Sequence, residues 1–102
     1  MNKNMNTQNN VPAHYKFWPP GVPYELDIPE INLWDNLQNM ASLAPDDIAI
    51  EFVGRSYTWK EFEQESLSLA GSMQSLGLKT GDRVLLIAQN CPQFAIGMHA
   101  IL

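Results

Sequence analysis

The C-terminal stretch of the sequence constrains the fold most, because it is more apolar than a short chain can cover by itself. Residues 83–88 read Arg-Val-Leu-Leu-Ile-Ala, and five apolar residues without alternation are typical of a strand buried on both faces, as in parallel sheets. Residues 93–102 predict a helix that is apolar nearly all round, and such a helix has to be buried. We therefore expect an α/β chain that is the N-terminal piece of a larger enzyme, truncated at Leu102. The alternative is a complete small domain that hides its last helix by dimerising.

The middle of the sequence predicts a helix followed by a β-hairpin. Asn32 is a good N-cap for a helix over residues 33–43. Residues 48–52 then predict a strand, residues 53–55 a tight connection and residues 56–58 a short returning strand.

The longest predicted helix covers residues 59–76. Thr58 and Glu61 have the spacing of a capping box, in which each side chain accepts a backbone N–H of the other residue. Gly77 is expected to end the helix in the left-handed conformation, with Leu78 making a hydrophobic contact beyond it. Apolar positions recur every three or four residues and predict one buried face: Trp59, Phe62, Ser66, Leu69, Ala70, Met73 and Leu76. The next four residues predict a turn into the buried strand.

We expect three regions along the chain. Residues 1–13 form a disordered tail, since five of the first ten residues are asparagine. Residues 14–31 form an extended lead-in rich in proline and aromatic rings, which need a folded body to cover them. Residues 32–102 begin the folded domain. Pro20 and Pro23 also have the spacing of a ligand for a proline-recognition domain, which is an alternative function for the lead-in.

Charge and composition exclude several classes of function. A length of 102 residues allows one domain at most. The composition is 45% hydrophobic, which is enough for one core. Eleven acidic and six basic residues give a net charge of −5, which argues against binding nucleic acid. The lone Cys91 fits a reducing compartment. The first residues lack the apolar stretch of a secretory signal, and no apolar run is long enough to cross a bilayer, so we expect a cytoplasmic protein.

The usual chemical motifs are missing. Gly77 and Gly81 are not followed by the Lys-Ser/Thr pair that a phosphate-binding loop requires, so they indicate turns. His14 and His99 have no companion ligands at metal-binding spacing. Cys91 precedes a proline at a predicted helix start, but no base is near it in sequence, which favours a small buried or capping residue over a nucleophile.

Three glutamates in the long helix complete the candidates. Glu61, Glu63 and Glu65 alternate, so we expect them to point to different sides of the helix and to form no acid–base pair. The sequence therefore predicts no catalytic, cofactor-binding or metal-binding residue in this chain.

Four strings in order resemble one enzyme family. They are Trp-Pro-Pro-Gly-Val-Pro at 18–23, L-W-D-N-L-Q at 33–38, A-P-D-D-I-A-I-E-F-V-G-R-S-Y-T-W-K-E-F at 44–62 and G-L-K-T-G-D-R-V-L-L-I-A-Q-N-C-P-Q-F at 77–94. Together they resemble the N-terminal region of adenylate-forming (AMP-binding) enzymes, especially bacterial long- and medium-chain fatty acyl-CoA ligases (acyl-CoA synthetases). The resemblance covers residues 14–102.

The resemblance implies a parent enzyme that joins a fatty acid to coenzyme A. With ATP and Mg²⁺ as cosubstrates, it would form an acyl-adenylate and release pyrophosphate, and coenzyme A would then displace AMP. The family's Ser/Thr/Gly-rich phosphate loop, its magnesium-associated acidic residue and its C-terminal lysine are absent from this sequence. The segment is therefore expected to be scaffold of the large N-terminal domain, to bind none of the cosubstrates, and to pack against the remainder of the same chain. Peripheral membrane association of the parent is compatible with this resemblance.

Other functions remain open at this point. Amino-acid-activating adenylation domains and luciferase-like oxygenases share much of the same scaffold. A stand-alone interaction module could bury the last helix in a partner. An acyl-carrier-like protein is the least favoured, because its serine would have to be Ser66, which lies in the middle of a predicted helix.

Overall fold

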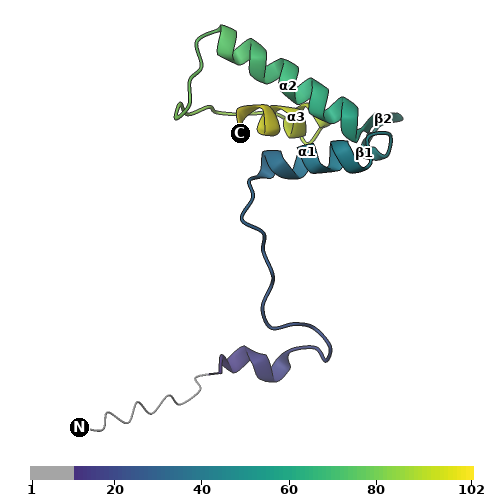
Figure 1. Ribbon diagram of the computed structural model, residues 1–102, viewed down its shortest axis with the longest axis vertical. Helices are drawn as coiled ribbons and strands as arrows, with labels where there is room; N and C mark the ends of the chain where they lie inside the picture. Colours follow the sequence, from purple (N-terminus) through teal and green to yellow (C-terminus); the bar gives the residue numbers. More distant parts are fainter. Residues whose placement is uncertain (1–10) are drawn as a thin grey trace, which may run out of the picture. The chain divides into compact units, whose positions relative to one another are not determined.

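The computed structural model describes residues 11–102 and divides the chain into two units, one reaching to Glu30 and one running from Ile31 to Leu102. Most of the expected tail, residues 1–10, lies outside the described residues. Figure 1 shows the elements in chain order. They are a 3-10 helix (Ala13–Phe17), α1 (Leu33–Leu43), β1 (Ile48–Phe52), β2 (Arg55–Thr58), α2 (Trp59–Ser75) and α3 (Pro92–Ile101).

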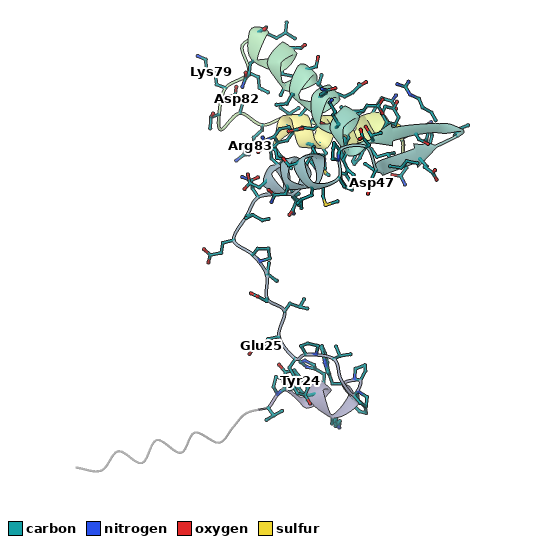
Figure 2. The ribbon with its side chains drawn as sticks, turned by 45° about the vertical axis from the view of Figure 1, so that its right-hand side comes forward. Tyr24, Glu25, Asp47, Lys79, Asp82 and Arg83 are labelled. Atoms are coloured by element: carbon teal, nitrogen blue, oxygen red, sulfur yellow. The ribbon has the colours of Figure 1, made fainter. Side chains whose placement is uncertain are left out.

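The first unit is organised by its aromatic rings. Tyr15 and Tyr24 stack with ring centroids 4.3 Å apart. The Trp18 and Tyr15 ring centroids are 5.8 Å apart. The Trp18 indole N–H donates to the carbonyl oxygens of Val22 and Pro23, at 3.1 and 3.2 Å. The expectation of an extended segment is therefore wrong at its start, where Ala13–Phe17 forms a 3-10 helix. Ring stacking within the segment favours this folded conformation over an extended one. Figure 2 labels Tyr24 within this group.

A tight turn brings these rings together. The Val22 N–H donates to the Pro19 carbonyl at 3.4 Å, and Gly21 has φ +79°. Proline at the second position and a left-handed glycine at the third are typical of a type II turn. Because polyproline II needs φ near −75°, Gly21 interrupts it between Pro20 and Pro23. The structure therefore does not present these two prolines as a proline-motif ligand.

Helix α1 begins and ends where the sequence predicts. The Asp35 N–H donates to Asn32 Oδ1 at 2.8 Å, and the Asn32 N–H donates to Asp35 Oδ2 at 3.2 Å. The N-cap is confirmed, and the reciprocal bond makes it a complete capping box. The Asn-x-x-Asp spacing in the sequence is typical of a capping box, although the role of Asp35 was not predicted. Leu37 and Ala41 are the buried residues of this helix.

Strands β1 and β2 form the predicted hairpin, which is antiparallel with Phe52 opposite Arg55 and Ile50 opposite Tyr57. The register shifts between Ile48 and Ile50. Two residues make the turn, and both have positive φ: Val53 at +46° and Gly54 at +77°. This combination is typical of a type I′ turn, which favours Asn or Gly at the first position and disfavours a β-branched residue.

Replacing Val53 by asparagine should therefore stabilise the hairpin. Val53 is 89% exposed, so little packing is lost, while relief of left-handed strain is worth about 1 kcal/mol. We expect Val53→Asn to raise the free energy of unfolding by about that amount in urea denaturation. Val53→Thr keeps the β-branch and adds polarity, and it should give no gain. Equal stabilisation by both variants would contradict the strain at this turn.

Helix α2 has the predicted start and end. The Glu61 N–H donates to Thr58 Oγ1 at 3.1 Å, and the Thr58 N–H donates to Glu61 Oε2 at 2.9 Å. At the other end Gly77 has φ +101°, its N–H donates to the Gln74 carbonyl, and the Leu78 N–H donates to the Met73 carbonyl. This pair of bonds is a Schellman motif. Both ends of the helix are thus confirmed to within one residue.

The predicted buried face of α2 is correct only in its first half. Phe62 and Ser66 are buried, and the Ser66 hydroxyl donates to the Phe62 carbonyl at 2.8 Å. Leu76, by contrast, is 89% exposed. The reason is length, because α2 has 17 residues and α3 only 10, so the end of α2 extends past its neighbour. Figure 1 shows this end standing clear of α1 and α3.

The core lies where three helices and the hairpin meet. It consists of four buried side chains, one each from α1, β2, α2 and α3: Leu37, Tyr57, Phe62 and Ile96. Trp34, Trp59 and Ala95 pack around them. In α3 the buried residues are Pro92, Ile96, Gly97 and Ala100, whereas Leu102 after its end is 66% exposed. Leu86 lies against Gly97, since a Cβ on this glycine would be 3.2 Å from the leucine Cδ1. The terminal helix is therefore covered on part of its surface only.

Residues 83–88 do not form the predicted strand. In the described part of the chain, no backbone–backbone hydrogen bond involves residues 83–90. Leu85 and Ile87 are 83% and 82% exposed, although full burial was expected. A strand needs a neighbour to pair with, and the sheet of the described residues contains only β1 and β2. The sequence pattern was that of a strand, but its pairing partner is not supplied by residues 11–102.

Candidate functional site

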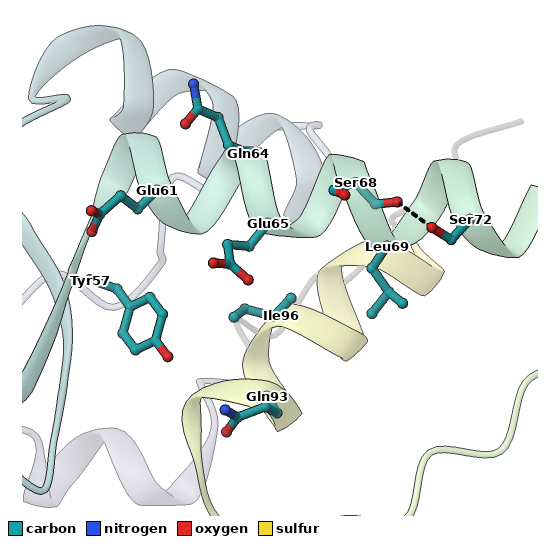
Figure 3. Close-up of a pocket in the computed structure, with 9 residues that line it drawn as sticks. All are labelled: Tyr57, Glu61, Gln64, Glu65, Ser68, Leu69, Ser72, Gln93 and Ile96. Atoms are coloured by element: carbon teal, nitrogen blue, oxygen red, sulfur yellow. Dashed lines mark hydrogen bonds between the residues drawn. The ribbon is translucent and has the colours of Figure 1, made fainter.

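The larger cavity lies between α2 and α3, with Tyr57 of β2 at one end, and measures about 620 Å³. Figure 3 shows that its floor is Ile96 of α3 and its wall is one face of α2. Its lining is Tyr57, Glu61, Gln64, Glu65, Ser68, Leu69, Ser72, Gln93 and Ile96. These residues combine carboxylates, amides and hydroxyls around apolar patches, without a lysine, arginine, histidine or cysteine.

The carboxylates of this cavity correct one prediction. Glu61 and Glu65 both line it, because residues four apart lie on the same face of a helix, while Glu63 is not among the lining residues. Glu61 also serves the helix start, because its Oε2 accepts the Thr58 N–H as part of the capping box. The prediction that the three glutamates point to different sides of the helix is correct for Glu63 only.

One hydroxyl of the cavity forms a hydrogen bond within its own helix. Ser72 Oγ donates to the Ser68 carbonyl at 3.0 Å, drawn as the dashed line in Figure 3. Such bonds back to the preceding turn are common for serine inside helices. The lining residues of this cavity include no histidine. Its carboxylates, amides and hydroxyls can hold a polar or cationic group.

The remaining candidates are not among the residues that line this cavity. Cys91 is the N-cap of α3, is partly buried, and makes no side-chain capping bond. His99 Nδ1 lies 2.9 Å from the Ala95 carbonyl oxygen, and its ring meets Phe62 edge-on at 4.9 Å. His14 packs against Tyr15 in the first unit. Across residues 11–102 there is no group of three metal-ligating side chains.

The second cavity, of about 320 Å³, lies between the far end of α2, the turn after it and the end of α3. The turn itself is confirmed: the Asp82 N–H donates to the Lys79 carbonyl, the Lys79 N–H donates to Asp82 Oδ2 at 2.8 Å, and Gly81 has φ +91°. Figure 2 labels Lys79, Asp82 and Arg83 at this turn. Gly77 and Gly81 thus serve backbone turns, as their spacing predicts. No helix in residues 11–102 is long and apolar enough to cross a membrane.

Comparison with known proteins places the chain in a family. A family model described as AMP-binding enzyme matches residues 37–102. A long-chain-fatty-acid–CoA ligase of Bacillus subtilis (strain 168) is 36% identical over 85 residues, which are 83% of this chain and 15% of that protein. A long-chain-fatty-acid–CoA ligase of Yersinia pestis is 33% identical over 89 residues, covering 85% of this chain and 16% of that protein.

A plant relative matches a shorter part. The 2-methylpropanoate–CoA ligase CCL4 of Humulus lupulus is 35% identical over 57 residues, covering 56% of this chain and 10% of that protein. No solved structure gives a significant match. The chain thus spans about 15% of the length of the bacterial ligases that it matches. Because the family model covers nearly two thirds of the sequence and the bacterial ligases match over 83% and 85% of it, the resemblance is confirmed, and the chain belongs to the AMP-binding enzyme family.

Proposed function

We propose that this chain is the N-terminal scaffold segment of an ATP-dependent fatty acid–CoA ligase. The observation that carries this proposal is the extent of the similarity to the bacterial ligases. A match over 85 residues leaves only 17 of the 102 outside it, so it has to begin at Trp18 or earlier. It therefore includes the Trp-Pro-Pro-Gly-Val-Pro turn of the first unit.

This extent favours fatty acids over the other substrates of the superfamily. The plant ligase for a short branched acid matches over 57 residues only, which is too few to require the lead-in. The lead-in is thus the part of the chain that supports the long-chain ligases over this shorter-acid ligase. Residues 32–102 would then begin the AMP-binding domain, with the remainder of a longer polypeptide packed against them.

The chemistry of the proposed reaction explains why this segment would serve as scaffold. A fatty acid carboxylate and the triphosphate of ATP are both anions, so cations and N–H donors have to offset their repulsion. The larger cavity instead carries Glu61 and Glu65 and no cationic side chain. ATP, Mg²⁺ and coenzyme A would bind to other parts of the parent enzyme. We place that enzyme in the cytoplasm, because the lone Cys91 suits a reducing compartment.

The 102-residue chain should therefore show no ATP–pyrophosphate exchange with a fatty acid and Mg²⁺. The physical reason is the absence of any group in its larger cavity that could neutralise a triphosphate at the reacting phosphorus. The measurement is incorporation of labelled pyrophosphate into ATP, with the Bacillus subtilis ligase as positive control. Exchange above the no-protein background would show that the segment carries catalytic groups of its own, and the scaffold role would be wrong.

A separate experiment tests the substrate class. The genomic reading frame around codon 102 is sequenced, and a longer product with a Ser/Thr/Gly-rich loop is expressed. We expect AMP release that depends on both a long-chain fatty acid and coenzyme A. Release with an amino acid, but not with a fatty acid, would assign the protein to the amino-acid-activating branch of the family.

A further inference from the structure

Residues 12–24, which we call the ring segment, are held by a cluster of aromatic side chains centred on Trp18. The Trp18 ring lies against three others, with its centroid 5.8 Å from Tyr15 and 5.9 Å from both His14 and Tyr24. Two of these partners, Tyr15 and Tyr24, also stack on each other at 4.3 Å. Aromatic pairs at such distances attract each other beyond the effect of the area that they bury. Trp18 thus joins the beginning of the segment to its end.

The hydrogen bonds of the ring segment are equally local. The Tyr15 N–H donates to the Pro12 carbonyl at 2.9 Å, and the Trp18 N–H donates to the Tyr15 carbonyl at 3.0 Å. The turn at residues 19–22 and the two bonds of the Trp18 indole close the segment further along the chain. Each of these bonds joins residues at most five positions apart. Because the entropy lost on closing a loop grows with its length, contacts of this range cost less than distant ones.

Four prolines lower the entropy cost of ordering this segment further. Positions 12, 19, 20 and 23 are proline, and each ring fixes φ at about −65° before the segment folds. The unfolded segment therefore samples fewer conformations, which favours the folded form. Gly21 supplies the φ of +79° that the turn needs, at no steric cost.

We propose that the ring segment is an autonomous folding element, which keeps this conformation when the second unit is unfolded. Its ring contacts, hydrogen bonds and turn each join two residues of the segment itself. The residues up to Glu30 also form a unit separate from Ile31–Leu102. A lead-in of this kind is ordered before it packs against anything else, so less conformational entropy is lost when it does. This autonomy does not depend on the ligase proposal, because it rests only on contacts within residues 12–24.

The first test uses the full 102-residue chain with its second unit unfolded by Phe62→Ala. Far-UV circular dichroism verifies that the helices of that unit are lost. We expect the Trp18 indole N–H to exchange with solvent at least about fivefold more slowly than the indole N–H groups of Trp34 and Trp59 in the same molecule. Equal exchange of the three indoles in this unfolded variant would overturn the proposal.

A urea series on the parent chain gives a second measurement that does not rely on the core variant. The urea dependence of an unfolding free energy scales with the surface that unfolding exposes, so a segment this short should respond far less steeply than the second unit. Nuclear Overhauser contacts between the Tyr15 and Tyr24 rings should decline gradually, without a step at the midpoint where the helices unfold. Loss of ring contacts and helices at one midpoint with one slope would overturn the proposal.

Three substitutions in the parent chain test whether the turn holds the segment. Gly21→Ala strains only the backbone, because nothing lies within 4 Å of the added methyl group, and it should lower the folding equilibrium constant of the ring segment at least about fivefold. Gly21→Asn should lower it less, since asparagine tolerates positive φ. Gly71→Ala is the matched control at a helical glycine with equally open surroundings, and it should leave the constant unchanged.

The Trp18 indole exchange and the tyrosine ring contacts report this constant, and urea denaturation reports the second unit. We expect Gly21→Ala to leave the urea midpoint of the second unit unchanged. Intact ring contacts in Gly21→Ala, or the same loss of contacts in Gly71→Ala, would show that the segment is not held by its own turn. A matching shift of the second unit's midpoint in Gly21→Ala would show that the two units fold together. Any of these results would overturn the proposal.

Discussion

Replacing Phe62 by alanine is expected to remove about 3–5 kcal/mol from the free energy of unfolding. The ring is only 5% exposed and is the part of α2 that meets the rest of the core. It contacts His99 of α3 edge-on at 4.9 Å and lies 6.3 Å from the Trp59 ring. A loss of this size is most of the stability of a small domain, so the variant should lose its cooperative urea transition.

Two variants separate this effect from a general loss of an aromatic ring. Phe62→Leu keeps most of the buried volume and should fall between the parent and Phe62→Ala. Phe17→Ala removes a ring that is 78% exposed and should leave the second unit's transition within about 0.5 kcal/mol of the parent. A Phe62→Ala chain with an unchanged transition midpoint would contradict the core described here.

Replacing Leu37 by alanine is expected to cost about 2–5 kcal/mol and to release α1 from the other helices. Leu37 is 1% exposed, and only Ala41 is buried with it on this helix. Leu37 is therefore the one large side chain that α1 buries fully, with Trp34 of the same helix partly buried beside the core. Urea denaturation gives the loss, and hydrogen exchange should show the amides of α1 losing more protection than those of α2.

The same helix offers a matched control. Leu43→Ala makes the identical change at a leucine that is 80% exposed and should change stability by no more than about 0.5 kcal/mol. Similar losses for Leu37→Ala and Leu43→Ala would mean that helix propensity, and not burial, sets the stability of α1. Equal loss of protection in α1 and α2 would show that the two helices open as one unit.

Local signals made most of the second unit predictable. The Asn32 and Thr58 caps, the Gly77 helix end and the Val53–Gly54 turn each depend on residues within five positions of one another. Hydrogen bonds of this range are decided by backbone geometry, which the residue types already favour. The family could be predicted for the same reason, because the strings that resemble it include these caps and turns.

Features that depend on distant neighbours were not predictable in the same way. A five-residue apolar run indicates a strand, but pairing requires a second strand, and the described residues supply none for Arg83–Ala88. Leu76 has the right spacing for the buried face of α2, yet whether it is covered depends on where α3 ends. Both errors arise because tertiary contacts override a local pattern.

The cavity beside α2 shows a different error. Glu61 and Glu65 lie four residues apart, which places them on one face, and this was visible in the sequence. The contribution of Tyr57, Gln93 and Ile96 was not, because β2 and α3 meet α2 only in the folded unit. Helical spacing alone therefore predicts which α2 residues share one side of the groove, but it cannot predict which residues of other elements complete it.

The close contact between Leu86 and Gly97 should couple these two positions in evolution. A glycine inside a helix costs about 0.5–1 kcal/mol relative to alanine, and α3 carries it at the point where the leucine approaches. An alanine at 97 would require the leucine to move by a few tenths of an ångström, and a longer side chain would need more room at position 86. Lineages that depart from this pair should therefore change both codons, so that coordinated replacement at 86 and 97 becomes the evolutionary trace of one close contact.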